Sequence, residues 1–279
     1  MSGRRHKRPR WDLSPAELER IRRSTAEPIR VGELSRAVLR SPKLAGSMFI
    51  AAARAAAAGA REHGAVPWLV QAHRVRRAVP DAAVGVTWHG EEPFLEALRP
   101  FLDPESRVLE VGCGGGRIAR LIAEGVGELV CTDVSELMLD EARRGLTGVP
   151  NVSFQVADAL LLDGLGDESF DLVYAHDVFV TFDPHMILVA LDSFRRVLTA
   201  GGVAVASFYT IDRPEWARQD LDLARRAARR GRFGPSLARP YTSAQIDAWF
   251  QLAGFEPIGD RFGEVREGQR HYIAAGRAA

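Results

Sequence analysis

The segment that most strongly constrains the fold is VLEVGCGGGRIAR, residues 108–120. An apolar run with β-branched residues ends at Glu110, a cluster of glycines follows, and an amphipathic run comes next. This order predicts a strand, a tight turn and a helix. Turns of this kind hold a ligand against the N-terminus of the helix, where backbone N–H groups have no helical partner. The segment therefore predicts an α/β fold with a ligand site at the end of a strand.

The rest of the chain from residue 86 onward alternates between strand and helix patterns, which predicts a parallel sheet with helices on both faces. In such sheets ligands bind outside the carboxyl ends of the strands, at the point where the strand order reverses. The patterns predict helices at 91–102, 117–124, 135–144, 184–198 and 243–253, and strands at 107–111, 128–132, 151–156, 170–174, 202–209, 255–260 and 270–275.

Residues 1–85 differ in character and are predicted to form a helical N-terminal extension that covers the active site or makes oligomer contacts. About ten residues at its start are basic and expected to be disordered. Ser14-Pro15-Ala16-Glu17 predicts a capped helix start. Residues 86–279 form the second predicted domain, with an insertion at 210–241. The insertion contains Trp216, Phe233 and an arginine-rich helix and is expected to act as a lid, although a solvated helix face is the simpler interpretation.

Composition favours a soluble globular protein. Of 279 residues, 46% are hydrophobic and 26% charged, and the net charge of +1 lacks the basic field of a general nucleic-acid binder. The two cysteines have no metal-ligand or disulfide spacing, which fits a reducing cytoplasm. The alanine-rich stretch 44–60 is interrupted by Arg54, and polar residues follow the twin arginines near the N-terminus. We therefore expect no transmembrane helix and no signal peptide.

The spacing of the glycine loop helps to identify its ligand. A dinucleotide fingerprint is G-x-G-x-x-G, but Arg117 follows the run that ends at Gly116 and breaks that spacing. The carboxylate of Glu110, just before the loop, would repel a pyrophosphate. It would accept a cationic amine or sulfonium. These residues favour S-adenosylmethionine over a nicotinamide dinucleotide.

Residues 109–275 resemble the class I S-adenosylmethionine-dependent methyltransferases, in the broad small-molecule group that includes ubiquinone-biosynthesis-type enzymes. The resemblance rests on the E-x-G-x-G-x-G loop, on CTDVSELML and QVADAL, and on RRVLTAGGVAVASF. It implies a Rossmann-like doubly wound sheet of seven strands, the last antiparallel. The usual L-x-P-G-G turn here reads Leu198-Thr199-Ala200-Gly201-Gly202, without the proline.

The resemblance also assigns residues to the cofactor. Asp133 would accept the ribose hydroxyls and Met138 would pack on the adenine; Asp158 would accept the adenine amino group while the Ala159 backbone meets a ring nitrogen. An N-cap role for Asp133 and a turn role for Asp158 stay open, and Ser135 looks the better cap. The expected cofactor-binding set is Glu110, Gly112, Cys113, Gly114, Asp133, Val134, Met138, Asp158, Ala159, Ala175 and His176.

Methyl transfer is a direct displacement, so the protein mainly aligns the reacting atoms. A general base helps an oxygen acceptor, and histidine suits that role near neutral pH. His176, after the fourth strand, is the first candidate by location, and Asp177 could orient it or act instead. His185 and His89 are alternatives, and a structural role for His176 is equally open.

Trp88, His89 and Tyr209 are the residues expected at the acceptor pocket. The chain shows no metal-ligand cluster, so no metal is expected. The D/N-P-P-Y/F motif of many amino-methylating enzymes is absent after the fourth strand.

The sequence therefore predicts a cytoplasmic enzyme that methylates a small secondary metabolite, at oxygen first and at nitrogen next, with carbon also open. The alternatives are an RNA or protein methyltransferase, a non-methylating cofactor-binding protein on the same fold, and, more distantly, a nicotinamide-dependent reductase. Nucleic acid and membrane are not expected partners, and a homodimer is left open.

Overall fold

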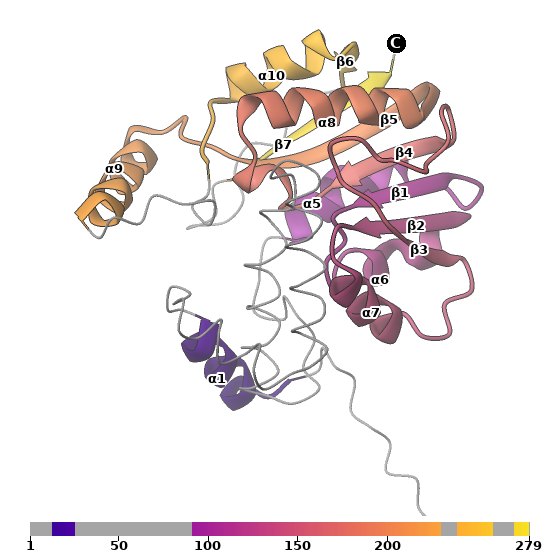
Figure 1. Ribbon diagram of the computed structural model, residues 1–279, viewed down its shortest axis with the longest axis horizontal. Coiled ribbons are helices and arrows are strands. Elements are labelled where there is room, and N and C mark those ends of the chain that lie inside the picture. The colour runs from indigo at the N-terminus through magenta and orange to yellow at the C-terminus, as the bar shows by residue number, and fades with distance from the viewer. Residues whose placement is uncertain (1–12, 26–90, 230–238, 259–270, 279) are drawn as a thin grey trace, which may run out of the picture.

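The computed structural model describes residues 13–25, 91–229, 239–258 and 271–278 (Figure 1). Except for α1 (Pro15–Thr25), the predicted N-terminal extension lies outside the described residues, as do Trp88 and His89. The helices are α5 (Glu91–Leu98), α6 (Ala119–Ile122), α7 (Glu136–Gly145), α8 (Pro184–Val197), α9 (Pro214–Arg229) and α10 (Ser243–Leu252), with short 3-10 turns η1 (Arg99–Phe101), η2 (Ala123–Gly125) and η3 (Phe179–Thr181).

Seven strands form one sheet in the order β3-β2-β1-β4-β5-β7-β6. Neighbouring strands from β3 to β5 are parallel, whereas β7 is antiparallel to both β5 and β6. The predicted doubly wound sheet with an antiparallel last strand is therefore confirmed. The strands are β1 (Arg107–Val111), β2 (Glu128–Asp133), β3 (Val152–Val156), β4 (Phe170–Ala175), β5 (Leu198–Tyr209), β6 (Phe255–Pro257) and β7 (His271–Ala278).

The strand order reverses at β1, which lies between β2 and β4. The chain winds from β1 toward β3 on one side and then returns to add β4 on the other. In doubly wound sheets, ligands bind at the carboxyl ends of the strands where the order reverses, which here is at the ends of β1 and β4. This is where the sequence predicts the cofactor site.

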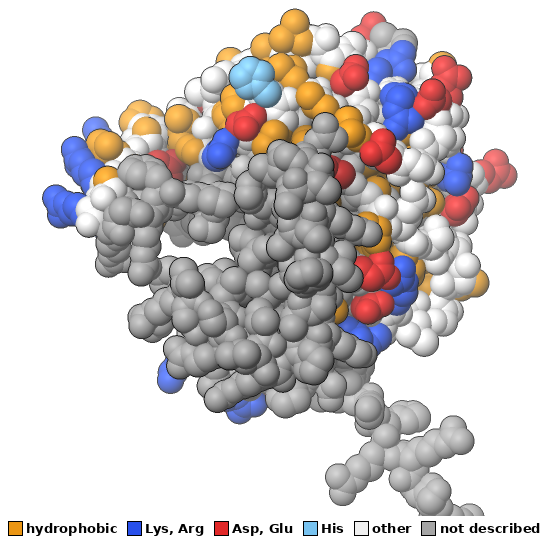
Figure 2. Space-filling model, in the orientation of Figure 1, with side chains coloured by type: hydrophobic (Ala, Val, Ile, Leu, Met, Phe, Trp, Pro, Cys, Tyr) orange, Lys and Arg blue, Asp and Glu red, His pale blue; other side chains and the backbone are white. Residues whose placement is uncertain are grey.

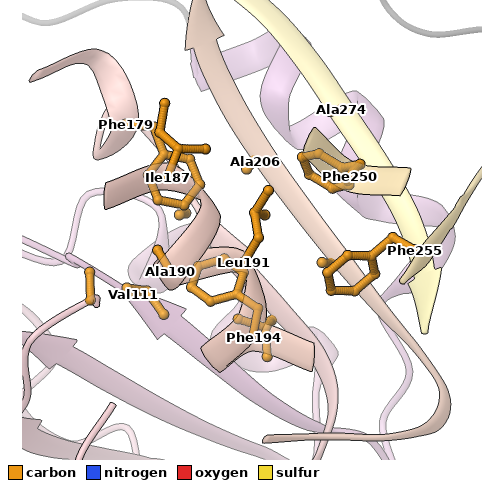
Figure 3. Close-up of a cluster of buried hydrophobic side chains, with 14 of the residues drawn as sticks. Val111, Phe179, Ile187, Ala190, Leu191, Phe194, Ala206, Phe250, Phe255 and Ala274 are labelled. Atoms are coloured by element: carbon orange, nitrogen blue, oxygen red, sulfur yellow. The ribbon is translucent and has the colours of Figure 1, made fainter. Parts of the chain in front are cut away.

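Each face of the sheet has its own hydrophobic core. On one face, Phe194 of α8 and Phe250 of α10 are buried with alternate strand residues such as Val111 and Ala206 (Figure 3). On the other face, Phe94 of α5 lies in a second cluster with residues of α6 and α7. Burying strand side chains on both sides is the pattern of parallel sheets, and it explains why these strands are nearly continuous in apolar residues.

Most of the predicted helices and strands are present, but several begin or end at other residues than predicted. The helix predicted at 91–102 stops at Leu98 and continues as the short turn η1, which contains Pro100. Leu198, predicted as the end of the preceding helix, and residues 199–201, predicted as a turn, belong to β5. The β4–β5 pairing shifts register between Phe170 and Leu172, and Gly201 has φ +77°, so a glycine accommodates this irregularity.

The predicted start of the N-terminal helix is confirmed by a complete capping box. The Ser14 backbone N–H donates to Glu17 Oε2 at 2.7 Å, and the Glu17 N–H donates back to Ser14 Oγ at 3.3 Å. Ile21 of the same helix is fully buried. Reciprocal satisfaction of two unpaired backbone donors is what makes this sequence pattern a reliable start signal.

The predicted insertion contains α9, which projects away from the sheet (Figure 1). The two ends of the insertion are hydrogen-bonded to each other where they leave the sheet. Thr210 and Tyr241 form a parallel bridge, the Tyr241 N–H donates to the Tyr209 carbonyl at 2.9 Å, and the Ser243 N–H donates to the Asp212 carboxylate. We call residues 209–212 and 239–243 the stem of the insertion.

Candidate cofactor site

The loop after β1 holds a tight conformation that depends on glycine. Gly112, Gly114 and Gly116 all have positive φ, at +69°, +54° and +79°. A Cβ on Gly112 would lie 2.5 Å from Val178 Cγ2, so the loop and the segment after β4 are in close contact. The Cys113 N–H donates to the Thr132 carbonyl at 2.8 Å, which ties the loop to the end of β2. The loop is thus fixed from both sides of the switch point.

Asp133 ends β2 and organises the backbone on either side of it. Its Oδ2 accepts the Gly114 N–H at 3.0 Å, and its Oδ1 accepts the Ser135 N–H at 2.9 Å. Burial raises the pKa of its carboxyl to about 6, although these two hydrogen bonds lower it. Each oxygen retains a second lone pair, so the carboxylate can still accept hydroxyl groups from a ligand.

Ser135 lies at the N-cap position as predicted, but the prediction that its side chain caps the helix is wrong. Ser135 occupies the N-cap position of α7, but its side chain makes no capping hydrogen bond. Its backbone N–H is instead taken up by Asp133, so the acid supplies the local turn that the sequence argument assigned to the serine.

Met138 and Val134 lie next to this acid. Met138 is buried on α7, and its Cε lies 3.4 Å from the position of a Cβ on Gly114. Val134 is half-buried between β2 and α7. A flexible thioether against the glycine loop is suited to packing on a planar ring, as the resemblance implies for adenine.

The segment after β3 reaches the same site. The Ala157 N–H donates to the Asp133 carbonyl at 3.2 Å. Asp158 Oδ1 accepts the Leu160 N–H at 2.8 Å, which is the turn contact that the sequence left open as an alternative. Ala159 is buried beside it. A turn role and a ligand role for Asp158 are compatible, because one carboxylate has two acceptor oxygens.

Glu110 lies behind the loop in a buried polar cluster. Its Oε2 is 3.7 Å from Cys131 Sγ, and Tyr174 of β4 is its neighbour across the sheet. Burial raises the pKa of the Glu110 carboxyl to about 8, despite lowering effects from Tyr174, Cys131 and Arg117. The sequence argument treated Glu110 as a negative charge facing the ligand. With its pKa raised to about 8, the buried carboxyl instead favours the protonated form at neutral pH when no ligand is bound.

Both cysteines of the chain belong to this cluster and are reduced. A side-chain hydrogen bond with Cys131, together with burial, raises the pKa of the Cys113 thiol well above its usual range. Burial likewise raises the pKa of Cys131 above its ordinary value, against a lowering hydrogen bond with Cys113. Thiols with raised pKa values are poor nucleophiles, so neither cysteine is suited to nucleophilic chemistry.

His176 and Asp177 follow β4, whose last residue, Ala175, is fully buried. The His176 side chain is only 2% exposed and stacks on Phe94 of α5, with ring centroids 4.4 Å apart. Its Nδ1 lies 3.1 Å from Ser207 Oγ, and its Nε2 lies 3.5 Å from Asp177 Oδ2. A general base must meet an incoming acceptor, and this arrangement keeps the imidazole covered.

The structure adds three residues that the sequence argument did not place at the site. Arg117 donates to Asp177 Oδ2 at 2.9 Å and to Glu91 Oε2 at 3.0 Å. Ser207 of β5 is fully buried beside His176. The sequence analysis used Arg117 only to exclude the glycine spacing of a dinucleotide-binding loop. Its partners lie 26 and 60 residues away, and only the sheet order brings them together.

The remaining expected residues lie elsewhere. Tyr209 ends β5 and is half-buried at the stem. His185 is 96% exposed on α8. Within the described residues, no group of three or more His, Cys, Asp or Glu side chains could hold a metal ion.

A sheet of this order, with a glycine loop after β1 and an acid ending β2, defines an α/β enzyme that binds a nucleoside cofactor at its switch point. Residues 108–202 match the protein family described as methyltransferase domain. A probable methyltransferase of Aspergillus luteorubrus is 30% identical over 211 residues, covering 69% of this chain and 67% of that protein. Trans-aconitate 2-methyltransferase of Acidovorax sp. (strain JS42) is 27% identical over 190 residues, covering 67% of this chain and 70% of that protein.

Among solved structures, magnesium protoporphyrin IX methyltransferase of Synechocystis, with bound S-adenosylhomocysteine, shares the fold. The two structures superpose with a TM-score of 0.52 at 17% sequence identity, and the match covers 67% of this chain and 79% of that one. The chain belongs to the class I S-adenosylmethionine-dependent methyltransferases, and S-adenosylmethionine is its cofactor. The residues present fit that group, because the Asp133 carboxylate offers acceptor oxygens at the end of β2, next to the backbone of the glycine loop.

No helix in the described ranges is long and apolar enough to span a membrane.

Proposed function

We propose that this enzyme transfers a methyl group to an oxygen atom of a small secondary metabolite, with nitrogen as the next acceptor. The observation that carries the proposal is the segment after β4, which contacts Gly112 through Val178. It reads His176-Asp177-Val178-Phe179 and lacks the D/N-P-P-Y/F motif of many amino-methylating enzymes. The Acidovorax relative, whose name gives trans-aconitate as its acceptor, supports a small organic molecule.

The charge pattern of α9 argues against an RNA acceptor. Glu215, Asp220 and Asp222 lie in the first half of the helix and Arg225, Arg226 and Arg229 in the second, and Arg225 pairs with Asp222 at 3.4 Å. Acidic and basic side chains are also interspersed over the described surface in Figure 2. A continuous basic face, which phosphate backbones require, is therefore missing from this view.

For the cofactor, we propose the set expected from the resemblance. Asp133 accepts the ribose hydroxyls, Met138 packs on the adenine, Asp158 and the Ala159 backbone meet its polar edge, and backbone at Ala175 and His176 flanks the methionine end. Glu110, Gly112, Cys113, Gly114 and Val134 complete the wall. When bound, S-adenosylmethionine supplies a methyl group on a sulfonium, which is a very good leaving group.

The chain's own residues then have to align the acceptor and exclude water. Tyr209 is proposed to line the acceptor pocket, as are Trp88 and His89 outside the described residues, and α9 is proposed as its lid. His176 as general base stays a prediction. Its burial against Phe94 and its contacts with Ser207 and Asp177 favour a positioning role instead.

The acceptor class is tested with S-adenosylmethionine carrying a 13C-labelled methyl group and a panel of phenols, carboxylic acids and amines. We expect labelled methyl signals at the chemical shift of an O-methyl group. The reaction with Asp133→Ala, which weakens the cofactor site, is the matched control. Transfer confined to amines, or to RNA or protein added to the same assay, would overturn the proposal.

A further inference from the structure

We propose that Arg117 is a positioning residue, which holds Asp177 and the segment after β4 in the conformation that forms the cofactor wall opposite the glycine loop. The inference rests on the proposed function in one respect, namely that residues 175–178 flank the cofactor. It assigns a role to a residue that neither the motif nor the fold requires.

The first observation is the backbone of Asp177, which has φ +59°. A residue with a Cβ adopts this left-handed conformation only at a free-energy cost, and it persists when surrounding contacts enforce it. Asp177 lies two residues after the end of β4, so this conformation sets the direction of the chain where it leaves the sheet.

Two contacts enforce it. The Asp177 N–H donates to the buried Ser207 Oγ at 2.9 Å, and its Oδ2 accepts Arg117 Nη2 at 2.9 Å. The Arg117 side chain is 9% exposed and its second nitrogen binds Glu91 at 3.0 Å. A planar guanidinium can bridge two carboxylates from different elements, which a lysine ammonium does with poorer geometry.

The same contacts define the proton positions around His176. Ser207 Oγ accepts the Asp177 N–H and lies 3.1 Å from His176 Nδ1, so its own hydrogen is available to donate to that nitrogen. Neutral His176 then carries its hydrogen on Nε2, which lies 3.5 Å from Asp177 Oδ2. Arg117 therefore fixes a carboxylate beside the imidazole edge that carries this hydrogen.

The consequence reaches the glycine loop through the next residue. Val178 Cγ2 occupies the space where Gly112 would carry a Cβ. If Asp177 relaxes out of the left-handed region, Val178 and the backbone after β4 must move relative to that loop. Arg117 thereby connects α5, the glycine loop and the turn after β4.

The test compares Arg117→Met with Arg117→Lys, and uses Arg107→Met as the matched control. Arg107 forms an exposed ion pair with Glu128 at the opposite end of β1. By calorimetry, we expect Arg117→Met to weaken S-adenosylmethionine binding by about tenfold or more, as removal of one partner of a buried pair does. Lysine should restore part of the loss, and the control should bind normally.

Asp177→Asn separates charge from backbone, because asparagine tolerates the left-handed conformation. If Arg117 acts through Asp177, the double variant Arg117→Met/Asp177→Asn should bind no more weakly than the worse single variant. Additive losses would overturn the inference.

Two measurements on the cofactor-free protein keep it testable even if the wild type fails to bind S-adenosylmethionine, a result that would refute the proposed function alone. Hydrogen exchange at the Asp177 amide should be faster in Arg117→Met than in the control. Nitrogen NMR should show the Nε2–H tautomer of His176 in the wild type. Unchanged exchange, or the Nδ1–H tautomer, would contradict the inference.

Discussion

At the scale of single residues, the Asp133 carboxylate accepts hydrogen bonds from two backbone N–H groups and can still accept hydrogen bonds from a ligand. Removing its carboxylate should weaken S-adenosylmethionine binding by about 1.5–3 kcal/mol, the usual value for hydrogen bonds to a charged acceptor. Calorimetry of Asp133→Ala measures this directly. Unchanged affinity would refute the ribose role.

The pH dependence of that affinity follows from the same residue. Because the pKa of Asp133 is raised to about 6, the carboxyl becomes protonated as the pH falls below that value and loses acceptor capacity. Affinity should therefore fall by up to about tenfold per pH unit below pH 6. Asp133→Asn cannot titrate and serves as the control. The same acid-side loss in that variant would assign it to another group.

The residue scale also shows where sequence reasoning reached its limit. Asp133, Met138 and the glycines lie together at the switch point, because their positions at the carboxyl ends of β1 and β2 determine where they meet. Arg117, Glu91 and Ser207 belong to the same site, yet their contacts depend on side-chain geometry between elements distant in sequence. The raised pKa of Glu110 was missed for a related reason, since its burial depends on how β2 and β4 pack on either side of β1.

At the scale of elements, the contact between the glycine loop and the turn after β4 limits which side chains each segment can accommodate. Gly112→Ala places a Cβ 2.5 Å from Val178 Cγ2 at φ +69°. We expect this variant to lose about 1–3 kcal/mol of unfolding free energy, from overpacking and from the left-handed conformation.

Adding Val178→Ala should recover the overpacking part of that loss but not the conformational part. Urea denaturation of both variants and of Val178→Ala alone gives the coupling. If the double variant shows the sum of the single effects, the contact does not carry strain.

Helix and strand ends were predictable where local chemistry sets them. The capping box at Ser14 and the Asp183 cap before Pro184 are examples, and in both an acceptor side chain meets an unpaired backbone donor. The irregular start of β5 was not predictable, because it depends on pairing with β4 and on hydrogen bonds from Thr199 across the sheet.

At the scale of the whole molecule, the buried Glu110 links global stability to pH. Its pKa is about 8 in the folded protein and 4.5 as the ordinary value. Between these values the folded state holds a proton that the unfolded chain has released. The free energy of unfolding should therefore fall as the pH rises, by about 1.4 kcal/mol per unit, until the folded group ionises.

Glu110→Gln keeps the size and hydrogen-bonding capacity of the side chain but removes the titration. Chemical denaturation from about pH 6.5 to 8, above the range in which Asp133 contributes, should show a shallower slope for this variant. Equal slopes for the two proteins would mean that Glu110 is ionised in the folded state.

The stem of the insertion bears on how such enzymes diversify. Because Thr210 and Tyr241 are already paired, a longer or shorter segment between them changes little in the sheet, and doubling the length of a flexible loop costs only about 0.6 kcal/mol. If α9 covers the acceptor as proposed, acceptor recognition can be exchanged as a cassette between sheets that keep the same methyl-donor site, and the stem provides the junctions for such chimaeras.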